Sequence, residues 1–270
     1  MKYTPKELQD DVTISNASPL KEFFVLLGGL LGILLVVYVA LGFAVELVVS
    51  RLSPEYEEFL GGFFANRYDQ GEKSEQERRL QQLLDDLAGK KGKDGRRYRV
   101  HVVQHPNVNA AALPGGHILI FDALISEVES ENELSFVLAH ELGHFANRDH
   151  LRGFGRGLVL LVLSTAVFGQ DSSISGFFLN SLQNVEVQFS QRQEKKADLR
   201  AVDLLQRKYG HVSGATDFLE DISKMDKKGR VAYFFATHPY PRDRITAIEE
   251  YIVSQQYVQK EKTALDPLFR

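Results

Sequence analysis

The sequence predicts a mainly α-helical protein with a small antiparallel β-sheet, an α+β class, behind one apolar N-terminal helix. Three observations support this prediction. Residues Phe23–Val45 form a run without a single charge. Ser74 and Ser130 each precede a glutamate by three residues, the capping-box spacing that begins a helix. Residues 98–104 (YRVHVVQ) alternate as in a half-buried strand.

Composition limits the functional classes. The chain of 270 residues is long enough for one domain of about 200 residues plus extra segments. A net charge of -4 gives no support for nucleic-acid binding. The chain has no cysteine, so it has no disulfides, and any metal site must use His, Glu or Asp.

The N-terminal part predicts a membrane anchor. We expect a loosely ordered tail at 1–22, a transmembrane segment at 23–50 and one catalytic domain at 51–270. The run 23–45 is long enough to cross a hydrocarbon core of about 30 Å as a helix. A buried core helix and a cleaved signal peptide are the alternatives, but no small-residue cleavage site follows the run.

The orientation of this anchor rests on few charges. Lys2, Lys6 and Lys21 precede the run, and Arg51 and Arg67 follow it. The positive-inside rule therefore favours a cytoplasmic N-terminus and a catalytic domain on the extracytoplasmic side.

After the anchor we expect a short helix at 54–65, broken at Gly61-Gly62, and a polar linker at 66–73. Ser74 then begins a helix to about Ala88, and 89–95 is a turn.

The sheet is predicted from strands at 98–104 and 117–121 and an extended segment at 107–112, with a turn at 114–116. The edge near this turn could align an extended peptide by strand addition, or it could be a structural hairpin only. Asp122 is expected to cap a short helix to about Val128.

The helix that begins after Ser130 carries His140, Glu141 and His144, the H-E-x-x-H pattern. Residues four apart share one face of a helix, so both imidazoles can bind one zinc ion. Glu141 is then placed to accept a proton from a water on the metal. Two histidines on an ordinary helix are the alternative, although chance would give this pattern in about one chain in a hundred.

Downstream, 158–168 is apolar but too short to span a bilayer, which predicts a helix buried against the domain; a segment that dips into the membrane is the alternative. Residues 170–176 are expected to form a loop and 177–208 one long helix. Glu194 and Asp198 lie one turn apart on this helix. We expect Glu194 to be the third zinc ligand and Asp198 to accept a hydrogen bond from a ligand histidine. A solvated charged face is the other interpretation.

These motifs together resemble the HtpX-like membrane zinc metallopeptidases, gluzincins whose wider family includes the CAAX prenyl endopeptidase. The resemblance covers about residues 75–250 and rests on four segments: Asn109–Gly116, His140-Glu-Leu-Gly-His144, Glu194-x-x-Ala-Asp198, and Thr237-His238-Pro239 with Arg244 six residues after the histidine.

The resemblance implies a zincin-like fold, a Zn²⁺ cofactor and polypeptide substrates. It implies that His140, His144 and Glu194 bind zinc, that Glu141 is the general base and that Asp198 supports a ligand. His238 and Arg244 are implied as active-site residues: His238 to stabilise the oxyanion, Arg244 to pair with Glu194, Asp198 or another carboxylate. The strand residues expected to align substrate are Asn109, Ala110, Ala111 and Ala112.

The chain departs from HtpX in having one clear span rather than several, and it lacks the multi-span chamber of prenyl proteases. We therefore expect a single-anchor endopeptidase at a membrane face, acting in membrane or envelope protein quality control. The alternatives are a zinc-containing, chaperone-like binding module with little proteolysis and a structural membrane protein. Residues 170–190 lie between the ligands in sequence and could shield the site.

Overall fold

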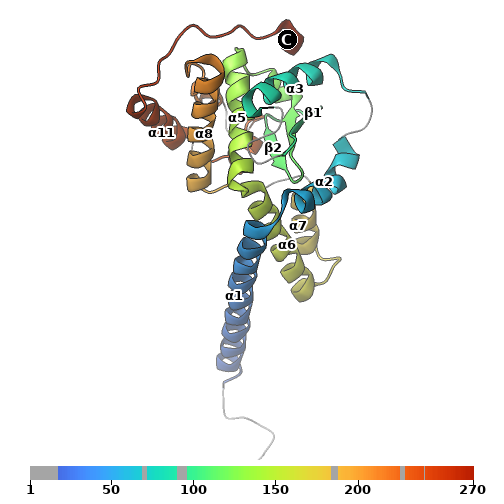
Figure 1. Ribbon diagram of the computed structural model, residues 1–270. Helices are drawn as coiled ribbons and strands as arrows, with labels where there is room; N and C mark the ends of the chain where they lie inside the picture. The colour runs from blue at the N-terminus through green and yellow to red at the C-terminus, as the bar shows by residue number, and fades with distance from the viewer. Residues whose placement is uncertain (1–17, 69–71, 90–95, 184–187, 226–228, 240) are drawn as a thin grey trace, which may run out of the picture.

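The computed structural model describes residues 18–68, 72–89, 96–183, 188–225, 229–239 and 241–270 (Figure 1). The first helix, α1 (Pro19–Arg51), extends away from the globular part of the chain (Figure 1). The prediction of a mainly helical chain with a small sheet and a long apolar N-terminal helix is confirmed. Of the predicted tail 1–22, residues 1–17 lie outside the described residues and Pro19 onward belongs to α1.

The remaining helices follow α1 in sequence, and the three strands of the sheet come between α3 and α4. They are α2 (Pro54–Tyr68), α3 (Glu75–Ala88), α4 (Asp122–Ile125), α5 (Glu131–Asn147), α6 (Asp149–Phe168), α7 (Ser173–Gln183), α8 (Gln191–Tyr209), α9 (Asp217–Lys224), α10 (Ala232–Thr237), α11 (Pro241–Ser254) and the short 3₁₀ helix η1 (Pro267–Phe269).

The sheet is mixed, which corrects the antiparallel prediction. Its strands are β1 (Arg99–Val103), β2 (Ala110–Leu113) and β3 (His117–Phe121), in the order β1-β3-β2. β2 and β3 pair antiparallel across the predicted turn, whereas β1 pairs parallel to β3. β2 follows β1 in sequence but lies on the far side of β3. The chain therefore reverses direction between β1 and β2 and again between β2 and β3, which makes β1 and β3 parallel.

The predicted helix starts at Ser74 and Ser130 are confirmed. The Ser74 hydroxyl accepts a hydrogen bond from the Glu77 backbone N–H at 3.0 Å, and Ser130 does the same for Glu133 at 3.3 Å. α3 buries four leucines against β1 and α5: Leu80, Leu83, Leu84 and Leu87. This layer fixes the position of α5 within the core.

The predicted break at Gly61-Gly62 is wrong, because α2 continues through both residues. A Cβ atom on Gly61 would lie 2.5 Å from the Cα atom of Gly115 in the β2–β3 turn. Gly61 therefore permits a close backbone approach and does not end the helix.

The single long helix predicted at 177–208 is also wrong. The segment contains the end of α7 and then α8, and Gln188–Ser190 between them is not helical. Ser190 and Gln193 form a new capping box, with the Gln193 side chain 3.0 Å from the Ser190 backbone N–H. Serine followed three residues later by glutamine begins a second helix there. Residues 184–187 lie outside the described part of the chain.

The helix predicted at 158–168 exists as the second half of α6, but it is not buried against the domain. Val162 is 60% exposed and Phe168 is 57% exposed, whereas Val159 is buried. α6 packs instead along α1 and α7. The predicted loop 170–176 is shorter than expected, because α7 begins at Ser173.

Candidate metal centre

Helix α5 carries the H-E-x-x-H residues inside the core. Every residue from Glu131 to Phe145 on this helix is buried. His140 is 4% exposed and His144 is fully buried, and their Nε2 atoms lie 3.0 Å apart. The four-residue spacing thus aims both imidazoles at one point in the protein interior.

Helix α8 brings the second pair of predicted residues to the same place. Glu194 is fully buried and Asp198 is 1% exposed. The two helices can approach this closely because Gly143 faces Ala197: a Cβ atom on Gly143 would lie 2.6 Å from the Ala197 Cα atom. Gly143 lies between the two histidines and Ala197 between the two acids, so this contact holds the two motifs together.

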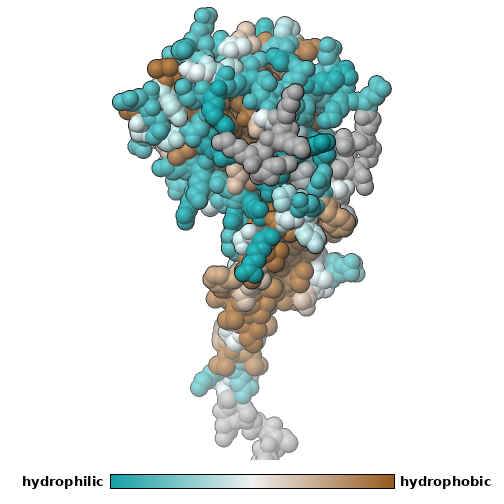
Figure 2. Space-filling view, viewed as in Figure 1, coloured by the Kyte–Doolittle hydropathy of each residue, from teal (hydrophilic) through white to brown (hydrophobic). Residues whose placement is uncertain are grey.

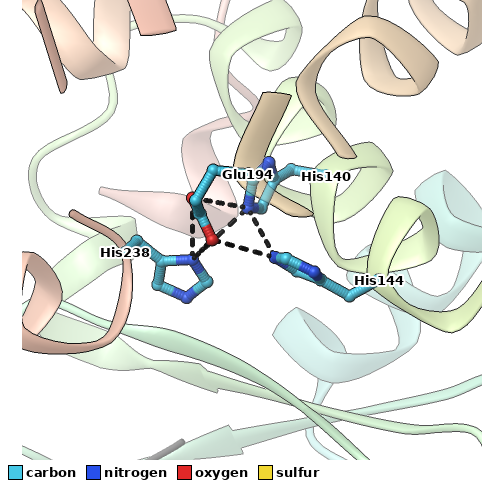
Figure 3. A group of neighbouring side chains, drawn as sticks. All are labelled: His140, His144, Glu194 and His238. Atoms are coloured by element: carbon cyan, nitrogen blue, oxygen red, sulfur yellow. Dashed lines mark hydrogen bonds and ion pairs between the residues drawn. The ribbon is translucent and has the colours of Figure 1, made fainter. Parts of the chain in front are cut away.

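His238 joins the same group from the end of α10. Its Nδ1 atom lies 3.3 Å from Nε2 of His140 and 3.2 Å from Oε1 of Glu194 (Figure 3). His140, His144, Glu194 and His238 each offer one ligand atom, and these atoms lie within 4.8 Å of one another.

The spacing of these atoms fits zinc. Four ligands at about 2.0–2.1 Å from a tetrahedral zinc ion are separated from each other by about 3.3 Å. Five of the six pairs in this group have a nitrogen–nitrogen or nitrogen–oxygen distance between 3.0 Å, for the Nε2 atoms of His140 and His144, and 3.6 Å, for Nε2 of His140 and Oε2 of Glu194, and the pair of His144 and His238 lies within 4.8 Å. Imidazole and carboxylate are also the ligands that zinc accepts in a cysteine-free chain.

Each histidine of the H-E-x-x-H motif is held at its other ring nitrogen. Nδ1 of His140 lies 2.8 Å from Oδ1 of Asp198, as the sequence suggested. Nδ1 of His144 lies 3.2 Å from Oδ2 of Asp149. Such carboxylate partners fix the ring orientation and make the metal-facing nitrogen more basic.

Arg244, at the start of α11, contacts both acids of α8. Its Nε and one terminal nitrogen donate to the two carboxylate oxygens of Asp198 at 2.8 and 2.7 Å. Its other terminal nitrogen lies 2.7 Å from Oε2 of Glu194. The pairing with Glu194 and Asp198, one of the options raised from the sequence, is present, and Arg244 itself is 2% exposed.

The charges around the site keep both acids of α8 ionised. Burial would raise the pKa of Glu194, but the charges of Arg244 and His238 outweigh it and hold this pKa well below its ordinary value. Burial would also raise the pKa of Asp198, but the charge of Arg244 outweighs this effect, and the pKa of Asp198 is lowered. For His140, burial lowers the pKa despite the neighbouring Asp198. For His144, burial would lower the pKa, but the hydrogen bonds with Asp149 and Glu194 outweigh burial and raise the pKa to about 10.

Glu141 lies beside this group of ligand atoms, and one of its carboxylate oxygens forms no hydrogen bond with the described residues. The side chain is 1% exposed, and its Oε1 atom lies 3.9 Å from Nε2 of His238. Its Oε2 atom is buried and has no hydrogen-bond partner among the described residues. A buried carboxylate oxygen without a partner is costly, so the site favours a further polar molecule at this position.

The four strand residues predicted to align substrate lie at the sheet edge, but most are covered. β2 pairs with β3 on one side, and Asn109, Ala110 and Ala112 are buried while Ala111 is partly exposed. The Thr237 hydroxyl donates to the Asn109 side chain at 3.3 Å. The start of this strand is therefore tied to the residue before His238.

Two residues of the site were not predicted from the sequence. Asp149 follows His144 by five residues, which is not a same-face spacing on one helix. It reaches His144 because α5 ends at Asn147, and the next residue, Arg148, has a left-handed backbone (φ 57°) that turns the chain into α6. Phe189 stacks on the His144 ring with centroids 3.9 Å apart, and no sequence pattern marked it.

This fold and site define a zinc-binding centre of the metallopeptidase type, with two histidines and a glutamate on paired helices. The chain belongs to peptidase family M48, whose sequence profile matches residues 74–252. The resemblance to HtpX-like metallopeptidases is thereby confirmed at the level of the family.

Individual relatives match over about the same region. The chain is 27% identical over 181 residues to mitochondrial metalloendopeptidase OMA1 of Schizosaccharomyces pombe, covering 66% of this chain and 53% of that protein. It is 29% identical over 182 residues to metalloprotease LoiP of Escherichia coli, covering 66% of this chain and 71% of that protein. A beta-barrel assembly-enhancing protease of Yersinia pestis is 25% identical over 163 residues, 55% of this chain and 33% of its own length. The chain thus spans about half of the first relative and a third of the last.

Proposed function

We propose that this protein is a membrane-anchored zinc-dependent endopeptidase. The observation that carries the proposal is the buried, unpartnered oxygen of Glu141 beside four converging ligand atoms. Membership of family M48 and the similarity to a metalloendopeptidase and a metalloprotease support it.

His140, His144 and Glu194 are the residues that would hold the metal. When bound, zinc lowers the pKa of a water molecule and polarises a carbonyl group. Glu141 accepts the proton of the attacking water and later delivers it to the nitrogen of the leaving amine. Asp198 and Asp149 orient the two imidazoles, and Arg244 keeps Asp198 and Glu194 charged and in place.

His238 has two roles in this proposal. In the arrangement described here its Nδ1 atom lies among the ligand atoms of His140, His144 and Glu194, where it would occupy the fourth position on a bound zinc ion. To stabilise an oxyanion, the imidazole has to leave the group and donate a hydrogen bond from the side. His238 follows the last residue of α10, and its backbone N–H donates to the Phe234 carbonyl at 2.7 Å, so the movement would be a rotation of the side chain that leaves this hydrogen bond in place.

The substrate would lie along Asn109–Ala112 as an additional strand, with its backbone pairing to the edge of β2. A cavity of about 480 Å³ beside Thr237, lined in part by Tyr233 and Phe177, offers room for a substrate side chain. Alignment along β2 places the scissile bond next to the residue that precedes His238.

We further propose the domain division 1–22, 23–50 and 51–270, with 23–50 as a single-pass anchor and the peptidase domain on the extracytoplasmic side. α1 has a mean hydropathy of 2.8 over its most apolar window. A tethered peptidase at a bilayer face suits a role in membrane or envelope protein quality control. The relatives whose names refer to mitochondria or to beta-barrel assembly are compatible with such a setting.

A comparison of membranes from cells with the wild type and with Glu141→Gln tests the proposal. Quantitative mass spectrometry of new N-termini should find fragments that are present with the wild type and missing with the variant. Identical fragment patterns, with both proteins equally abundant and zinc-loaded, would support the zinc-containing binding module instead.

A further inference from the structure

The segment Gly157–Gln183, here called the α6–α7 hairpin, is unusually poor in charge. It comprises most of α6, the turn at 169–172 and all of α7, and Asp171 in the turn is its one charged residue. A helix pair on the outside of a water-soluble domain normally carries a polar face. The helical residues of this hairpin carry no charge at all, although the segment lies between the predicted metal residues of α5 and α8 in sequence.

Large apolar side chains are exposed along both of its helices. Their exposed fractions run from 41% to 62%, for Leu158, Val162, Val167, Phe168, Ile174, Phe177 and Leu179. Val162 and Val167 are five residues apart and point about 140° away from each other around α6. An apolar surface on several sides of a helix suits a fluid apolar environment better than one rigid partner face.

This surface is continuous with that of α1. α6 packs along α1, and a Cβ atom on Gly155 would lie 2.6 Å from Cγ1 of Val45. A groove of about 390 Å³ between them is lined by apolar residues only, with Leu41 and Val48 from α1 and Leu158 and Val162 from α6 among them. Figure 1 shows α1, α6 and α7 leaving the same end of the globular part, and Figure 2 shows hydrophobic surface gathered there.

Charged residues mark the same level on both elements. On α1 the charge-free run ends at Glu46, and on α6 the last charge is Arg156. Arg152 of α6 forms a two-pronged salt bridge with Glu46, at 2.7 and 2.8 Å. Away from the globular part, α1 is uncharged from Val45 back to Phe23, and α6 is uncharged from Gly157 to Phe168, so the two uncharged stretches begin near the same level.

We propose that the α6–α7 hairpin inserts into the same bilayer as α1 and returns on its own side. The twelve residues Gly157–Phe168 span about 18 Å as a helix, which is less than the hydrocarbon core of about 30 Å. In the turn, the Ser175 hydroxyl donates to the Gly169 carbonyl at 2.8 Å, and the Ser172 hydroxyl donates to Ser175 at 2.9 Å. These internal hydrogen bonds satisfy the two serine hydroxyls and the Gly169 carbonyl, which lipid cannot do. Asp171 in the same turn is exposed, so insertion requires its carboxyl group to be protonated or to keep water around it. The proposal rests on the anchor role of α1 and is independent of peptidase activity.

The chain has no tryptophan, so one introduced tryptophan reports on its own surroundings. Val162→Trp and Leu179→Trp probe the hairpin, because neither side chain lines the cavity beside Thr237. Val36→Trp on α1 and Val253→Trp on α11 are matched controls, because their native side chains are 68% and 77% exposed. The zinc-loaded full chain is reconstituted in phosphatidylcholine vesicles, with and without bromine on the lipid acyl chains, and casein hydrolysis is measured in the same vesicles.

We expect brominated lipid to quench the hairpin tryptophans at least half as strongly as the one at position 36, and to leave the one at position 253 unquenched. Hairpin tryptophans that match position 253 while position 36 is quenched would overturn the proposal. The proposal is also overturned if self-association of the chain protects the hairpin tryptophans from both lipid and water. An unquenched position 36 overturns both the anchor and the hairpin insertion. Loss of hydrolysis with normal quenching would count against the peptidase function alone.

Discussion

The contact between Gly143 and Ala197 makes a quantitative prediction for Gly143→Ala. The new methyl carbon would lie 2.6 Å from the Ala197 Cα atom and 2.8 Å from its carbonyl oxygen. Carbon atoms that are not bonded approach to about 3.5 Å at best. Helices α5 and α8 must therefore separate by about 1 Å, which moves Glu194 away from His140 and His144.

The effect on stability should be small, and the effect on activity large. Overpacking of a core costs about 1–3 kcal/mol. The higher helix propensity of alanine offsets about 1 kcal/mol of this cost. The net loss in the free energy of unfolding is thus about 0–2 kcal/mol. A misplacement of about 1 Å at a catalytic site can reduce the rate about 100-fold.

The assay is casein hydrolysis together with zinc content and thermal unfolding. Gly62→Ala is the matched control, because Gly62 is also helical and a Cβ atom there meets no other atom within 4 Å. It should keep full activity and the same or slightly higher Tm. Wild-type hydrolysis and zinc content in Gly143→Ala would refute the idea that this glycine sets the spacing of the two motifs.

Three further results are expected. Asp149→Asn should weaken zinc affinity about 10–100-fold, measured by competition with a chelator, because His144 loses the carboxylate that orients it; an unchanged affinity would contradict that role. Arg244→Met should lower the free energy of unfolding by about 3–5 kcal/mol in denaturant titrations, because it leaves the buried carboxylate of Asp198 without its cation; a stable variant would contradict it. Chelation of the wild type should stop hydrolysis and lower Tm, and added zinc should restore both; hydrolysis that survives complete metal removal would exclude the zinc mechanism.

The sequence predicted those parts of the fold that depend on local interactions. The capping serines Ser74 and Ser130 and the four-residue spacing of His140 and His144 act within one or two helical turns, so they are visible as patterns. The capping box of Ser190 is equally local, yet the polar run around it was interpreted as one continuous helix.

Features that depend on distant contacts could not be predicted in this way. Gly61 looks like a helix breaker until Gly115, far along the chain, is seen to pack against it. Asp149 becomes a partner of His144 only through the left-handed turn at Arg148. The parallel pairing of β1 likewise follows from the place of β2 beyond β3, which alternation within each strand does not encode.

The candidate site shows the same division. Helical spacing indicated which residues of α5 and α8 share a face, but their meeting depends on the packing of Gly143 against Ala197. His238 and Arg244 were suggested by the family resemblance and not by spacing. The position of His238 inside the ligand group became visible only in the structure.

The most direct test of the central claim is the zinc content of purified Glu141→Gln, measured on the same preparation as its rate of casein hydrolysis. The variant removes the proton acceptor but none of the four converging ligand atoms. It should bind one zinc ion per chain, as the wild type does, and hydrolyse casein at least about 100-fold more slowly. Wild-type hydrolysis by the variant, or a wild-type protein that binds no zinc, would contradict the claim.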